Sequence, residues 1–279
     1  MKRFLTCIFL ISLLASCATG RPTKTEKEKK AELYYGYGTS NLINKKYTEA
    51  LTNLMEAAKY DPEDSRIQNN LGMAFYFKKD KKSAIRHIRR AIKLDENNND
   101  AMVNLASIYY NDKNYLAARK YYEKVRKSLT YKNQFRVLYN LGLIEFKTGN
   151  SVKALTYLEE SLSENEDYCP SHFLKGRIYE VKRDYNQAYE SYRKSYHGPC
   201  YNNPAPHFKT GVMLVKKGDF LKARLKFNEI MERFSTSIYS AKSGDYLRLI
   251  QGKAKEKAYT NNKLKKLEDE VKKYESTDF

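Results

Sequence analysis

Two cysteines and two histidines stand in short motifs whose residue types could carry chemistry. Cys169-Pro-Ser-His172 and His197-Gly-Pro-Cys200 each place a cysteine three residues from a histidine. Two thiolates and two imidazoles at this spacing could bind zinc. The same two thiols could instead form a disulfide, or they could remain free. The compartment in which the chain resides bears on this choice, and the N-terminus carries information about it.

The N-terminus predicts export. Lys2 and Arg3 precede a mostly apolar segment from Phe4 to Leu14, and small residues lead from there to Cys17. This is the pattern of a secretory signal, in which a positively charged N-terminus is followed by a short apolar segment and then by small residues at the cleavage site. The apolar segment is shorter than the ~20 residues that a membrane-spanning helix needs.

Leu14-Ala15-Ser16-Cys17 resembles the bacterial lipobox. This resemblance implies that residues 1–16 are removed as a lipoprotein signal peptide. It also implies that Cys17 receives diacylglycerol on its sulfur and an N-acyl chain on its new amine; no other cofactor is expected. Two or more acyl chains anchor a protein stably to a membrane. Ala18, where Asp would imply retention in the inner membrane, implies an outer-membrane anchor with the body in the periplasm. The alternative is a plain secreted protein.

Export of the chain would determine the state of each of its four cysteines. Cys7 leaves with the signal and Cys17 is lipidated, so Cys169 and Cys200 remain as a pair. Disulfides persist in oxidising compartments, and we therefore expect Cys169 and Cys200 to be bridged. Zinc ligation with His172 and His197, and free thiols, stay as alternatives.

The rest of the chain gives no sign of catalysis. It contains no H-E-x-x-H motif, no glycine-rich phosphate loop and no nucleophile elbow, so we expect neither an enzyme nor a small-molecule substrate. Removing Lys2 and Arg3 with the signal lowers the formal charge from +19 to +17. Such a charge favours acidic partners or anionic surfaces. An exported lipoprotein meets little nucleic acid, so nucleic acid is not an expected partner.

The elements that position these residues repeat along the chain. One alanine recurs at spacings of 34, 34, 36, 34 and 35 residues, at Ala50, Ala84, Ala118, Ala154, Ala188 and Ala223. A small residue precedes each by twelve positions, at Gly38, Gly72, Ala106, Gly142, Gly176 and Gly211. This pattern resembles the tetratricopeptide repeat, whose period is 34 residues.

The resemblance implies an all-α fold, a right-handed superhelix (solenoid) of six helix-turn-helix repeats. Each small residue lets the two antiparallel helices of its repeat approach closely, and neighbouring pairs stack. The predicted repeats are 31–64, 65–98, 99–134, 135–168, 169–203 and 204–236. Residues 17–30 are predicted to be the lipidated cysteine and a flexible tether. Within 237–279, the part up to residue 250 is expected to cap the last repeat, before a Lys-rich tail.

The first helices of tetratricopeptide domains line a concave groove. Here the second and sixth positions of the repeats supply Arg66, Arg136, Asn70, Asn104 and Asn140. This set resembles the carboxylate clamp of peptide-binding tetratricopeptide domains, which holds a terminal carboxylate or a peptide backbone. The alternative is structural, since Asn before Leu-Gly is common in these repeats. Aromatic groove positions could instead bind an apolar strand or amphipathic helix, at Tyr76, Tyr110, Phe146 and Phe208.

Six such repeats behind a lipobox resemble the type IV pilus biogenesis lipoproteins, the pilotins of the PilF, PilW and Tgl kind. The stretch 127–150 and the sequence RFSTS at 233–237 are similar to that family. The resemblance implies a non-enzymatic scaffold on the outer membrane that binds the pilus secretin and helps it insert and multimerise. The alternative is a repeat lipoprotein that scaffolds peptidoglycan enzymes or envelope proteases.

Overall fold

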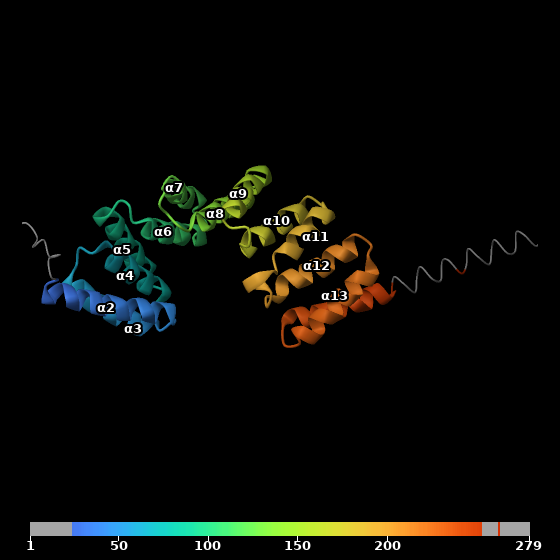
Figure 1. Ribbon diagram of the computed structural model, residues 1–279, viewed down its shortest axis with the longest axis horizontal. Coiled ribbons are helices and arrows are strands. Elements are labelled where there is room, and N and C mark those ends of the chain that lie inside the picture. Colours follow the sequence, from blue (N-terminus) through green and yellow to red (C-terminus); the bar gives the residue numbers. More distant parts are fainter. Residues whose placement is uncertain (1–23, 253–261, 263–279) are drawn as a thin grey trace, which may run out of the picture. The chain divides into compact units, whose positions relative to one another are not determined.

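The computed structural model describes residues 24–252 and residue 262. The predicted signal peptide, Cys17 and most of the Lys-rich tail lie outside the described residues. The described segments form helices and connecting turns, without a strand among them (Figure 1). None of these helices is both long enough and apolar enough to cross a bilayer.

The described residues fall into two compact units, 24–121 and 122–252, whose boundary lies inside one helix. The first unit contains α2 (Glu26–Ile43), α3 (Tyr47–Tyr60), α4 (Ser65–Phe77), α5 (Lys81–Leu94), α6 (Asn99–Asn111) and most of α7 (Tyr115–Arg126). In it α2 packs on α3, and α4 packs on α5.

The second unit repeats the same arrangement. It contains α8 (Gln134–Lys147), α9 (Ser151–Glu164), α10 (Cys169–Val181), α11 (Tyr185–Lys194), the 3-10 helix η1 (Gly198–Cys200), α12 (Pro204–Lys216) and α13 (Phe220–Arg233). A further helix begins at residue 238 and continues to 252, the end of that described segment. Here α8 packs on α9, α10 on α11, and α12 on α13.

The first helix begins earlier than the sequence pattern suggested. Residues up to 30 were predicted to belong to a flexible tether, but α2 starts at Glu26. Thr25 and Glu28 form a capping box: the Glu28 N–H donates to Thr25 Oγ1 at 3.2 Å, and the Thr25 N–H donates to Glu28 Oε2 at 2.7 Å. These bonds satisfy backbone donors that a helix start leaves unpaired, which is why the helix extends into a charged segment.

Within each repeat the two helices touch at the small residue of the first helix. A Cβ added to Gly72 would lie 2.5 Å from Ile88 Cγ1 and 3.0 Å from the carbonyl oxygen of Ala84. Gly38 faces Leu54 in the same way, with the added Cβ 2.5 Å from Leu54 Cγ. Ala84 and Ile88 are completely buried. The predicted small-residue contact is therefore the centre of each helix pair.

A polar side chain at the fourth repeat position ties some repeats to the loop before them. Gln68 donates to the Pro62 carbonyl at 2.9 Å, and His172 and His207 each place Nε2 2.8 Å from a carbonyl, that of Glu166 and of Tyr201 respectively. Each carbonyl belongs to the residue six positions earlier. The two histidines thus serve packing between a first helix and the loop before it. Burial lowers the pKa of both and favours the neutral ring, in which the carbonyl contact selects the tautomer that carries its proton on Nε2.

The turn inside each repeat contains one residue with positive φ. The values run from 59° to 90°, at Lys45, Lys79, Lys113, Gly149, Arg183 and Gly218. Glycine adopts this left-handed conformation freely, whereas a residue with a Cβ does so at a cost of roughly 1 kcal/mol. Four of these six turns therefore hold a strained lysine or arginine where glycine would fit without strain.

The helix at 238–252 covers the apolar side of the last repeat. Tyr246 contacts Phe208 and Phe227, with ring centroids 5.6 Å and 5.1 Å apart, and Ile250 is buried in the same cluster. Phe208 was predicted to line the groove. It is only 8% exposed because this helix and Tyr239 pack over it, so it belongs to the core.

The close helix contact gives a direct test. We expect Gly72→Ala to lower the free energy of unfolding by about 1–3 kcal/mol, because its methyl group overlaps Ile88 and the Ala84 carbonyl. The matched control is Gly36→Ala on α2, where nothing lies within 4 Å of the added Cβ; it should stabilise the chain by about 0.5–1 kcal/mol. Urea unfolding followed by circular dichroism measures both. Equal effects of the two variants would contradict the packing described above.

Candidate functional site

The groove asparagines of the first unit are linked to one another. Asn104 Nδ2 donates to Asn69 Oδ1 at 2.9 Å, Asn69 Nδ2 donates to Asn70 Oδ1 at 3.1 Å, and Asn70 Nδ2 donates to Thr39 Oγ1 at 2.9 Å. This amide chain crosses from the first helix of repeat three to that of repeat one. Asn69 is its buried centre, and nothing in the repeat pattern distinguishes it from neighbouring polar residues.

Arg66 is engaged with carboxylates of its own chain. Its Nη2 lies 2.6 Å from Asp64 Oδ2 and 3.1 Å from Glu32 Oε2, and its guanidinium lies over the Tyr35 ring at 5.0 Å. Burial acts to raise the pKa of Asp64, but the hydrogen bonds from Arg66 outweigh it and the pKa is lowered. A ligand carboxylate would have to share this arginine with Asp64 or displace Glu32.

The aromatic groove positions of the first unit are half-buried. The Tyr76 hydroxyl accepts a hydrogen bond from Asn111 Nδ2 at 2.8 Å, and its ring meets Phe77 edge-on at 5.8 Å. Tyr110 packs against Tyr115 with ring centroids 5.5 Å apart. Both rings therefore have fixed positions and still reach the surface.

The remaining predicted groove residues belong to the second unit. Arg136 is exposed, and its guanidinium lies 5.6 Å from the Phe135 ring. Asn140 stands one helical turn further along α8 and is half-buried. Phe146, at the end of the same helix, is half-buried beneath Arg177 at 5.4 Å. The predicted set thus divides into Arg66, Asn70, Asn104, Tyr76 and Tyr110 in one unit, and Arg136, Asn140 and Phe146 in the other.

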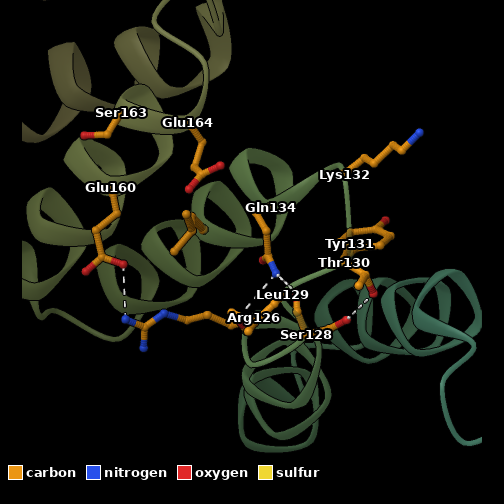
Figure 2. A pocket seen from close by; sticks show the side chains of 11 residues that line it. Arg126, Ser128, Leu129, Thr130, Tyr131, Lys132, Gln134, Glu160, Ser163 and Glu164 are labelled. Carbon is orange, nitrogen blue, oxygen red and sulfur yellow. Dashed lines mark hydrogen bonds and ion pairs between the residues drawn. The ribbon is translucent and has the colours of Figure 1, made fainter.

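A pocket of ≈ 560 Å³ lies at the start of the second unit, where the loop from 127 to 133 joins α7 to α8. Gln134 holds this loop, since its Nε2 donates to the carbonyls of Ser128 at 2.6 Å and Val125 at 3.2 Å. Arg126 closes one side through an ion pair with Glu160 at 3.2 Å (Figure 2). Leu129, at the pocket, is fully exposed.

This loop accounts for the longer spacing of 36 residues between Ala118 and Ala154. The interval before repeat four is two residues longer than the repeat period, and the extra length forms the wall of the pocket. An exposed leucine beside a charged pair suits contact with a protein segment that offers both an apolar and a polar group.

The two thiols of the second unit form a disulfide. Cys169 begins α10 and Cys200 ends η1, with their Cα atoms 6.4 Å apart. His172 faces the Glu166 carbonyl, and His197 stacks on Tyr196 with ring centroids 5.6 Å apart. In the described part of the chain no three side chains of metal-binding type come together as ligands.

Comparison with known proteins agrees with the repeated geometry. Three family models described as tetratricopeptide repeat match residues 38–98, 99–163 and 170–196, which together span more than half of the chain. The chain belongs to the tetratricopeptide repeat proteins. The predicted all-α repeat fold is confirmed.

The similar proteins include components of type IV pilus assembly. The type IV pilus assembly protein PilF of Pseudomonas aeruginosa is 25% identical over 191 residues, which cover 66% of this chain and 76% of PilF. A solved structure of PilF from Pseudomonas aeruginosa matches 80% of this chain and 100% of its own, with a TM-score of 0.68 and 19% identity. PilW, a widely conserved type IV pilus biogenesis factor, matches 75% of this chain and 96% of its own, with a TM-score of 0.67 and 16% identity. This tetratricopeptide repeat protein is thus related to pilus biogenesis factors.

The disulfide should contribute to stability. The bridge closes a segment of 31 residues, for which the chain-entropy estimate is about 3–4 kcal/mol. We expect Cys169→Ala combined with Cys200→Ala to lower the free energy of unfolding by that amount. Mass spectrometry of the unreduced wild-type protein should show one intramolecular disulfide joining these residues.

Reduction provides the control. A reducing agent should lower the stability of the wild-type chain towards that of the double variant and leave the variant unchanged. Two alkylatable thiols in freshly prepared native protein, or stoichiometric zinc, would contradict the bridge.

Proposed function

We propose that this chain is a lipid-anchored, non-enzymatic scaffold of the outer membrane that assists assembly of the type IV pilus secretin. The observation that carries the proposal is its sequence similarity to PilF, which extends over three quarters of that protein. The lipobox-like sequence at Leu14–Cys17 supplies the proposed anchor, and the body would then lie in the periplasm.

The amide chain of the first unit suits recognition of an extended peptide. An Asn side chain has two donor hydrogens and one acceptor oxygen, the same groups that a peptide backbone presents. Asn70 and Asn104 each use one donor within the chain, so each retains capacity for a ligand. Their fixed positions lower the entropy that binding would otherwise cost.

Arg136 and Phe146 give the second unit a different character. Arg136 is exposed near the start of α8 and Phe146 is half-buried at its end, so the two suit a carboxylate and an apolar side chain at separate points of one extended segment. We assign both surfaces to the same class of partner, an envelope protein with the secretin as the primary candidate.

The anchor is tested first. Cys17→Ser should abolish lipid attachment, because serine lacks the thiolate that the acyl-transfer chemistry requires. Metabolic labelling with a palmitate analogue, together with detergent phase partitioning, measures this. Cys7→Ser is the matched control and should keep full label, since Cys7 lies in the segment removed on maturation. Undiminished label in the Cys17 variant would refute the lipoprotein assignment.

Deletion of the gene tests the function. We expect the deletion strain to accumulate monomeric secretin, without multimers that resist heat and detergent on a gel, and to lack pili. Normal multimers and pili in that strain would refute the assignment and favour a scaffold for peptidoglycan enzymes or envelope proteases.

The groove is tested by complementing that strain with Asn104→Ala combined with Arg136→Ala, one change in each unit. Each lost hydrogen bond should weaken partner binding by about 0.5–3 kcal/mol, the upper end applying to charged groups. Fewer secretin multimers are therefore expected at unchanged protein level. Asn53→Ala with Arg90→Ala removes the same residue types from second helices and should complement fully. Full activity of the groove variant would place the docking site elsewhere.

A further inference from the structure

The first unit separates its charges between its two ends. The turns inside its three repeats, 44–46, 78–80 and 112–114, contain five lysines and two aspartates, and α5 begins with two further lysines at 81 and 82, which makes a net charge of +5. The loops between its repeats, 61–64 and 95–98, contain five acidic residues and no basic one, and Asp100 follows in the first turn of α6. Because the helices of a repeat are antiparallel, the first set of turns lies at one end of the helices and the loops lie at the other.

The basic end is continuous across the three repeats. Lys78 Nζ donates to Thr48 Oγ1 at 3.0 Å, which joins the turns of repeats one and two. Lys81 Nζ pairs with Asp112 Oδ1 at 2.8 Å, which joins the turns of repeats two and three. Lys45, Lys46, Lys79 and Lys113 are exposed beside these links.

The backbone shows that lysine is not the residue the turn itself prefers. Lys45, Lys79 and Lys113 have φ of 59°, 68° and 60°, in the left-handed region that favours glycine. The equivalent turns of repeats four and six are made with Gly149 and Gly218. The first unit thus keeps a cation at the strained position in all three turns. Strain retained at repeated surface positions points to a function for the side chain.

A pocket at this end combines the cations with an apolar surface. It has a volume of ≈ 480 Å³ and lies between the turns of repeats one and two. Four lysines line it, Lys45, Lys46, Lys78 and Lys79. The other lining residues are Tyr47, Thr48, Glu49 and Phe77. The rings of Tyr47 and Phe77 stack at 4.6 Å, and Phe77 remains 39% exposed. We call these eight residues the basic pocket.

We propose that the basic pocket binds an acidic segment of a partner protein, with the carboxylates on the lysines and a bulky apolar side chain against Phe77. The four lysines supply charge complementarity to the carboxylates. The exposed Phe77 ring supplies an apolar contact that inorganic anions and simple polyanions do not use. This surface lies at the turns, separate from the amide chain, and so adds a second contact region to the scaffold.

The choice of a protein over the membrane surface rests on the proposed anchor at Cys17. The chain enters the first unit through α2, whose first residues lie at the acidic end, as the Arg66–Glu32 ion pair and the Tyr34–Tyr60 stack show. An 18-residue helix is about 27 Å long. The proposed anchor therefore joins the first unit at its acidic end, and the basic pocket lies at the other end of α2.

Fluorescence anisotropy tests the proposal on the whole chain carrying Cys17→Ser, which is free of lipid. The probe is a labelled peptide of glutamates interrupted by two phenylalanines. We expect saturable binding that weakens as salt is raised, because exposed charges are screened. Lys45→Gly combined with Lys79→Gly should weaken binding about fivefold to tenfold, since exposed ion pairs contribute modestly.

The glycine substitutions separate recognition from folding. They remove charge and also relieve the left-handed strain, so the unfolding midpoint should stay equal or rise while binding falls. Lys29→Gln with Lys93→Gln removes the same charge from other exposed positions of the unit and should leave binding unchanged. Phe77→Ala should weaken binding of this peptide. The same variant should leave unchanged the binding of a control peptide in which alanine replaces both phenylalanines.

Three results would overturn the proposal. They are undiminished peptide binding by the Lys45→Gly/Lys79→Gly variant, equal binding of a lysine-containing control peptide, and binding to vesicles of equal parts phosphatidylethanolamine and phosphatidylglycerol but not to the peptide. The last would assign the surface to lipid. The assay involves neither secretin nor pili, so its outcome is independent of the test of the proposed function.

Discussion

The contact between the small residue of each first helix and the helix that follows it is the constraint on which the other features depend. A glycine at this point lets the partner side chain, Leu54 or Ile88, sit directly on the backbone. Once the two helices are this close, a turn of a few residues must join them, and one of its residues takes a left-handed conformation. The left-handed turn position and the groove positions both follow from that spacing.

Polar groups in this fold serve the structure and the surface together. Gln68, His172 and His207 tie first helices to preceding loops, and the asparagines form a chain across three repeats. A buried polar group without a partner costs more than a formed hydrogen bond contributes, so these contacts fix positions as well as stabilise them. A groove built in this way presents amides at defined places, which suits a scaffold that recognises extended chain.

Antiparallel pairing converts the composition of short turns into a property of a whole surface. The turns within repeats all emerge at one end of a unit, and the loops between repeats emerge at the other. The helix dipoles of an antiparallel pair oppose one another, so they add little net polarity. The charge separation of the first unit therefore comes from its side chains, from lysines at 44–46, 78–82 and 112–114 against acids at 61–64 and 95–100.

The sequence by itself determined the helix pairs and their order, because the small residues recur with a fixed period and the contact they make is local to one repeat. Only the tertiary structure showed that Phe208 is covered by the helix at 238–252, that Arg66 is shared with Glu32, and that Asn69 links Asn70 to Asn104. It also showed that the longer interval before Gln134 folds into a pocket wall. These features depend on contacts between side chains about one repeat apart in sequence, or on the path that a loop takes. A pattern of residue types records which positions are apolar or small, and it does not record which partner each polar group finds.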